Sequence, residues 1–139
     1  MLSYKTRLNS SPTGKPKIFF TAHPEEHSAL LETVSRDILE ALGAAVWYDT
    51  DPARDVDGDE EFFEALGEMR LFVIAITQRL LREPSRALGT ELAFAKDNHI
   101  PVLPIVVESI DPDLYARHLG SAQYLDRASS DSSATNITA

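Results

Sequence analysis

Several features are missing from this sequence, and each absence excludes a class of protein. There is no cysteine, which rules out disulfide bonds, thiolate metal ligands and a cysteine nucleophile. The longest apolar run, residues 71–76, is far too short to cross a bilayer, and the amino terminus carries no hydrophobic signal segment. We therefore expect a cytoplasmic protein without a membrane segment.

Positive charge is also scarce. The chain has 13 Lys and Arg residues against 22 Asp and Glu residues, and its formal net charge is -9. A protein that follows a nucleic-acid backbone needs Lys and Arg gathered on one face. The charge balance therefore argues against a nucleic-acid partner.

The sequence motifs of common cofactor and metal sites are absent as well. No glycine-rich loop follows the apolar run at 17–20, and neither Thr21 nor Ser85 stands in a nucleophile elbow. The histidines, which lack the spacing of a zinc site, are His23, His27, His99 and His118. Rossmann-type dinucleotide binding and P-loop chemistry are thus excluded, and we expect no resident cofactor and no metal site.

What is present is the composition of one globular domain. The chain has 139 residues, of which 43% are apolar and 25% charged. Residues 1–16 are polar and are expected to form a flexible lead-in, and the Ser-rich stretch 127–139 a disordered tail. The domain is therefore predicted over 17–126, and the polar ends suggest that it is a module of a longer protein.

Apolar periodicity predicts alternating strands and helices across this domain. Short β-rich runs predict strands at 17–20, 44–48, 71–76, 101–107 and 123–126. Apolar residues at intervals of three or four predict helices at 24–42, 60–70, 85–98 and 111–119. Pro101 and Pro104 lack amide donors, so the fourth strand is expected to be only partly paired.

This alternation favours an α/β fold, in which a mostly parallel sheet has helices on both faces. In such sheets ligands bind beyond the carboxyl ends of the strands. The segments to inspect are therefore 21–24, 49–59, 77–86 and 107–111.

Glu91 is the most informative residue in the sequence. In the predicted helix its neighbours at three and four positions are apolar, so its carboxylate falls inside the buried stripe. One interpretation is a carboxylate at the helix edge that reaches water or pairs with a cation such as Arg86. The other is a partly desolvated carboxylate kept for chemistry, since such burial raises a pKa at a cost in stability.

Two other features have alternative interpretations. The acidic stretch 49–61 has several acids at calcium-loop offsets, but Ala53 takes the first ligand position, so a solvated loop that leads into a helix is favoured. His23 follows a predicted strand. It either contacts a phosphate or hydroxyl of a ligand, or is a loop histidine without a role.

Five stretches, taken in order, resemble a bacterial TIR (Toll/interleukin-1 receptor) domain: "KIFFTAHPEEHSALL", "GAAVWYDTD", "MRLFVIAITQRLL", "SRALGTELAFA" and "HIPVLPIVV". The resemblance covers about 17–126. It implies a flavodoxin-like three-layer sandwich with a five-stranded sheet in the order 2-1-3-4-5.

The resemblance also implies a function. Many bacterial TIR domains are nucleosidases or cyclases that cleave the nicotinamide-ribose bond of NAD+ in antiviral defence and act when the domains assemble. The family's catalytic glutamate falls on Glu91. The same alignment makes NAD+ a substrate rather than a cofactor, and it places further binding residues at Phe20, Thr21, Ala22, His23, Trp47, Asp49 and Arg86.

A second hypothesis is a TIR domain without catalysis. It would pair with other TIR domains, through the 49–59 loop and the helix that follows it. Family enzymes often carry an aromatic residue where Ala87 stands, and its absence removes a stacking surface for the substrate. The sequence keeps both hypotheses open.

Overall fold

The computed structural model of the chain describes residues 2–5, 17–42, 45–51, 53, 55–121 and 123–127. Its strands are β1 (Leu2–Lys5), β2 (Lys17–Thr21), β3 (Ala45–Asp49), β4 (Leu71–Ile76), β5 (Val102–Val106) and β6 (Leu125–Asp126). Its helices are α1 (His27–Leu42), α2 (Glu60–Gly67), α3 (Gln78–Arg82), α4 (Leu92–Asp97) and α5 (Pro112–Leu119), with a π-helical turn, η1 (Ala87–Glu91), directly before α4.

The strands form one six-stranded sheet in the order β1-β3-β2-β4-β5-β6. The pairs from β3 through β6 are all parallel, so the expected order 2-1-3-4-5 of the five parallel strands is confirmed. The strand β1 was not expected, because residues 1–16 were assigned to a flexible lead-in. Instead Leu2–Lys5 pairs antiparallel with β3 and covers one edge of the sheet.

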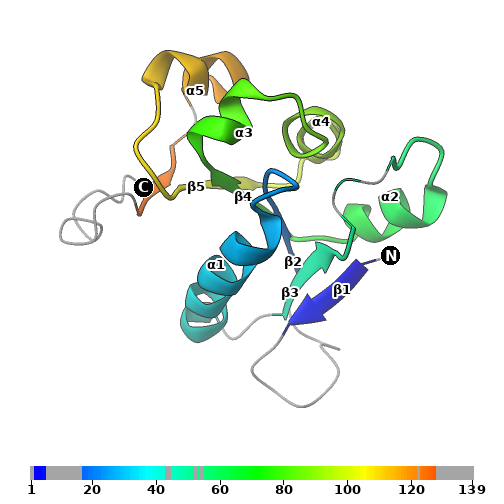
Figure 1. The fold of residues 1–139 in the computed structure, drawn as a ribbon. Helices are drawn as coiled ribbons and strands as arrows, with labels where there is room; N and C mark the ends of the chain where they lie inside the picture. The colour runs from blue at the N-terminus through cyan, green and yellow to red at the C-terminus, as the bar shows by residue number, and fades with distance from the viewer. Residues whose placement is uncertain are drawn as a thin grey trace.

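Helices cover both faces of the sheet, as expected (Figure 1). The alternation of side chains along β4 defines the two faces. Phe72, Ile74 and Ile76 pack into the cluster that contains residues of α2, α3, α4 and α5. Val73 and Ala75 pack into the cluster that contains residues of α1. The protein is therefore a three-layer α/β sandwich of the flavodoxin-like kind.

Side chains at the loop ends fix where several helices begin. The Asp59 carboxylate accepts a hydrogen bond from the Phe62 amide at the start of α2. The Thr77 hydroxyl accepts one from the Leu80 amide at the start of α3, and Asp111 caps α5 in a similar way. Each cap satisfies an amide that the helix itself leaves without a partner.

Pro104 lies inside β5, a strand that pairs with β4 on one side and with β6 on the other. It pairs in register with Ile74 of β4, whereas β6 begins its pairing one residue later, at Ile105. The two-residue β6 therefore needs no hydrogen bond from the position of Pro104, which has no amide proton. This agrees with the expected partial pairing of β5.

The predicted helix at 85–98 is the element that differs most. It begins as the π-helical turn η1 and becomes an α-helix only at Leu92.

None of the described helices is both long enough and apolar enough to span a membrane. The expected linker at 6–16 and tail from 128, and the expected helix end at Gly43, lie outside the described residues.

Candidate functional site

The carboxyl edge of the sheet gathers polar side chains from several elements. Thr21 ends β2 and Asp49 ends β3, two neighbouring strands of the sheet. Glu91 ends η1, which lies over this edge, and all three side chains are almost completely buried. Buried polar groups in an α/β fold must be paired: here Thr21 pairs with Glu91, and Asp49 pairs with Arg86.

Glu91 is at the centre of this group, with 1% of its surface exposed. Its Oε1 accepts a hydrogen bond from the Thr21 hydroxyl at 2.5 Å. Its Oε2 accepts one from Arg86 Nε at 2.8 Å. The two features that the sequence offered as alternatives, burial in the apolar stripe and an ion pair with Arg86, are therefore found together.

Arg86 joins Glu91 to a second buried carboxylate. Its Nη2 donates to Asp49 Oδ2 at 2.8 Å, and only 9% of its side chain is exposed. The guanidinium carbon lies 4.9 Å from the centre of the Phe62 ring, within the range of a cation–π contact. Arg86 thus bridges β3, α2 and η1, and it does so with two different nitrogens.

The π-helical turn explains why Arg86 reaches Glu91. In an α-helix, residues five apart point in directions about 140° apart, so their side chains do not meet. Here the Glu91 amide donates to the Arg86 carbonyl at 2.9 Å, a bond between residues i and i+5. This wider turn places residue 91 one turn after residue 86.

The buried environment perturbs two ionisable groups. Burial raises the pKa of Glu91, while the charge of Arg86 and the hydrogen bonds from Thr21 and Arg86 oppose the rise. Burial also lowers the pKa of His27 to about 4, although the nearby Asp49 charge acts in the opposite direction. His27 is therefore neutral at neutral pH, with its ring 5.3 Å from that of Phe20.

The other residues that the resemblance assigned to binding are arranged differently. Phe20 and Ala22 alternate with Thr21 along the chain and pack in the cluster on the α1 face of the sheet. Trp47 lies two residues before Asp49 on β3, and its ring centre is 5.4 Å from Lys17 Nζ. The structure therefore joins Thr21 and Arg86 to Glu91 directly and Asp49 through Arg86, whereas Phe20 and Ala22 pack on the other face of the sheet.

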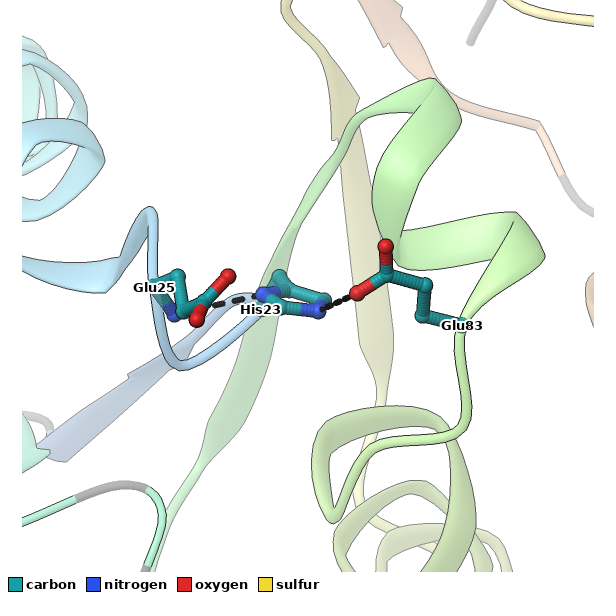
Figure 2. A group of neighbouring side chains, drawn as sticks. All are labelled: His23, Glu25 and Glu83. Atoms are coloured by element: carbon teal, nitrogen blue, oxygen red, sulfur yellow. Dashed lines mark hydrogen bonds and ion pairs between the residues drawn. The ribbon is translucent and has the colours of Figure 1, made fainter.

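His23 belongs to a neighbouring cluster, which Figure 2 shows with Glu25 and Glu83. One ligand atom from each residue lies within 4.8 Å of the others, a spacing that can hold a metal ion. However, Arg79 pairs with Glu25 and also donates from Nε to Glu83 Oε1 at 3.2 Å. Both carboxylates thus already share one cation, the guanidinium of Arg79.

The tautomer of His23 also opposes a metal ion. Its Nδ1 accepts a hydrogen bond from the Glu25 amide at 3.2 Å, so the ring proton is on Nε2, which lies 2.8 Å from Glu83 Oε1. A metal ion on Nε2 would require the proton on Nδ1, facing the Glu25 amide. We therefore interpret this cluster as an ion-pair network that attaches α3 to the end of β2.

Two hollows on the surface are lined by described residues other than Glu91. One, of about 770 Å³, is lined by residues such as Lys17, Arg70 and His99 at the opposite edge of the sheet. The other, of about 320 Å³, is lined by Ser85, Leu88 and Gly89 among others, on the same segment as Arg86. The second hollow is the one next to the candidate site.

Phe62 and His27 belong to this region and were not singled out from the sequence as site residues. Phe62 is one of the apolar residues of the helix predicted at 60–70, and no local pattern distinguishes a ring that supports a guanidinium. His27 falls in the first turn of α1, and only the fold brings it close to Asp49 and Arg86.

Comparison of the sequence with models of known protein families gives no match, and comparison with curated proteins gives none either. The assignment of a function therefore depends on the site itself and on the resemblance in the sequence.

Proposed function

We propose that this chain is a TIR-type NAD+ nucleosidase in which Glu91 is the catalytic carboxylate. The observation that carries the proposal is the place of Glu91: a buried carboxylate at the carboxyl edge of a parallel sheet, hydrogen-bonded to Thr21 at the end of β2. This edge is where open α/β sheets bind their ligands.

The proposed reaction breaks the bond between the ribose carbon and the nicotinamide nitrogen of NAD+. Both electrons of the bond stay on nitrogen, so the pyridinium leaves as neutral nicotinamide and the ribose becomes an oxocarbenium ion. Water then adds to that carbon and releases a proton, which gives ADP-ribose. A cyclising enzyme would instead add a nitrogen of the adenine ring.

Glu91 suits this reaction because a negative carboxylate stabilises a neighbouring oxocarbenium ion, or hydrogen-bonds the ribose hydroxyls as charge develops. Since nicotinamide leaves as a neutral molecule, no second acid is needed to protonate it. Burial raises the pKa of Glu91, which also improves its ability to accept a proton from the attacking water. Arg86, which contacts Glu91, is the cation that we assign to the pyrophosphate.

The experiment is chromatography of NAD+ after incubation with the protein held at high density on beads, since the TIR resemblance implies activity on assembly. Wild type should release nicotinamide, and Glu91→Gln should reduce the rate at least a hundredfold. Glu68→Gln, at the opposite edge of the sheet and paired with Lys17, should leave the rate unchanged. Equal rates for wild type and Glu91→Gln would end the proposal.

One observation favours a second candidate, a TIR domain that acts only by binding other TIR domains. Both oxygens of Glu91 are engaged and its surface is 1% exposed, as in a purely structural ion pair. This candidate predicts that dense wild-type protein leaves NAD+ intact and still self-associates, which light scattering at increasing concentration would detect.

A further inference from the structure

Both oxygens of the Glu91 carboxylate accept hydrogen bonds from neighbouring side chains, and the residue is buried. Thr21 occupies Oε1 and Arg86 occupies Oε2. A substrate cannot touch a carboxylate that is 1% exposed. Any chemistry at Glu91 therefore requires one of its two partners to move.

Of these two partners, Arg86 is the one whose side chain can change position. The Thr21 hydroxyl sits on a short side chain, fixed to a strand that pairs on both sides. Arg86, by contrast, has a long flexible side chain on the segment between α3 and η1. It holds Glu91 through Nε and Asp49 through Nη2, so the first contact can break while the second remains.

We propose that Arg86 is a gate: bridged between Asp49 and Glu91 it closes the carboxylate, and release of Glu91 with retention of Asp49 opens it. The Phe62 ring supports the guanidinium in either position, because a cation–π contact does not depend on which nitrogen faces Glu91. The role of the opened carboxylate in catalysis rests on the proposed function, but the opening itself does not.

The chemistry of the ligand that replaces Arg86 follows from what Glu91 loses. A buried carboxylate deprived of its cation is strongly disfavoured, so the incoming group must bring positive charge or hydroxyl donors. The pyridinium ring and the ribose hydroxyls of a nicotinamide nucleotide supply both. The gate therefore favours cationic nucleosides over neutral ones.

The gate also connects Glu91 to the loop at 50–59. Asp49 lies immediately before this loop and Phe62 lies shortly after it, in α2. Both residues that hold Arg86 away from solvent are thus attached to the two ends of the loop.

The absence of native cysteine allows a direct test of the opening. The variant Thr21→Cys places a single thiol against Glu91, where 2% of the residue surface is exposed, and its reaction with a thiol reagent reports opening of the gate. Adding Arg86→Lys keeps the positive charge but removes the fork that spans two carboxylates. We expect labelling at least tenfold faster than with Arg86 in place, while Arg82→Lys, an exposed residue of α3, leaves the rate unchanged.

A second thiol separates gate opening from general loss of stability. Ala75→Cys, on β4, is fully buried on the α1 face and should not respond to Arg86→Lys. If Arg86→Lys is too unstable to study, the gate can still be tested with Arg86 in place, by measuring how the labelling rates depend on urea. Low urea should leave Thr21→Cys labelling unchanged and accelerate Ala75→Cys labelling, because a local opening exposes little surface.

Two outcomes would overturn the gate: an unchanged Thr21→Cys rate in Arg86→Lys, or labelling of Thr21→Cys that depends on urea as steeply as that of Ala75→Cys. The NAD+ assay then separates the gate from the proposed function. Faster labelling of Thr21→Cys together with no nicotinamide release from dense wild-type protein would keep the gate and remove the nucleosidase.

Discussion

Arg86 and Glu91 are joined twice, once through their backbones and once through their side chains. The Glu91 amide donates to the Arg86 carbonyl at 2.9 Å, and Arg86 Nε donates to Glu91 Oε2 at 2.8 Å. The backbone bond makes the turn π-helical, and the π-helical turn makes the side-chain bond geometrically accessible. Local backbone geometry and burial of charge therefore depend on each other at this site.

Glu91→Gln should make the protein more stable at neutral pH. The folded state raises the pKa of Glu91, so wild type loses stability as pH rises above about 4.5, where the unfolded carboxyl ionises. Glutamine does not titrate, and Arg86 keeps its bond to Asp49. The gain should therefore grow with pH, by about 1.4 kcal/mol for each unit of the raised pKa.

Urea unfolding of wild type and Glu91→Gln between pH 4 and 8 measures this gain. The control is Glu68→Gln, because Glu68 belongs to an exposed pair with Lys17 and should change stability by less than about 1 kcal/mol at every pH. A constant difference across the whole pH range would show that Glu91 titrates normally.

His27 should make the protein less stable in acid. Its folded pKa of about 4 lies below the ordinary value of 6.5, mainly because the ring is buried. The unfolded chain thus binds the extra proton first, and stability falls as pH drops from 6.5 to about 4, by about 2 kcal/mol after allowance for screening by solvent. Its contribution is fully present above pH 6.5.

Replacement by a ring that does not titrate tests this assignment. His27→Phe should flatten the slope of unfolding free energy between pH 4 and 6.5. His99→Asn is the matched control, because His99 is exposed and has a φ of 58°, a conformation that asparagine tolerates. A slope that persists in His27→Phe would assign the pH dependence to other groups.

Arg86→Ala should destabilise the fold by about 3–5 kcal/mol, because it leaves Asp49 and Glu91 buried without the cation between them. Adding Glu91→Gln to this variant should stabilise it by about 1–3 kcal/mol more than Glu91→Gln stabilises wild type, and this difference is the coupling expected for residues in direct contact. Denaturant unfolding of the four proteins of this cycle gives the coupling directly. Arg82→Ala, on the exposed side of α3, should change stability by about 0.5 kcal/mol or less.

Asp59→Ala should cost about 1 kcal/mol through loss of the cap on α2, since its carboxylate accepts from the Phe62 amide. Asp57→Ala, two residues earlier and exposed, removes the same charge without a cap and should have a much smaller effect. Thermal unfolding of the two variants compares them. If the α2 cap also positions Phe62 beneath Arg86, Asp59→Ala should in addition speed labelling of Thr21→Cys.

The sheet order was predictable because each parallel strand is a short apolar run followed by a turn, and because the resemblance supplied the order. The strand β1 was not, since Leu2–Lys5 lies in a polar stretch and gains its place by pairing with β3. Likewise η1 carries the apolar periodicity of an ordinary helix. Its wider turn appears only in the backbone hydrogen bonds.

The candidate site was predictable in part. The position of Glu91 in an apolar stripe indicated burial, and its nearness to Arg86 suggested an ion pair. The sequence did not predict that Asp49 also pairs with the Arg86 guanidinium, because 37 residues separate Asp49 from Arg86. The resemblance also placed Phe20 and Ala22 beside the site, although alternation along β2 turns their side chains toward α1.

The antiparallel course of β1 has a practical consequence for every assay suggested above. Leu2 lies opposite Asp49 in this pair, so the first described residue of the chain is next to one residue of the candidate site. An affinity tag or fusion partner attached ahead of Leu2 would therefore lie near the end of β3 that carries Asp49. Immobilisation through the other terminus is the better design for work on this protein.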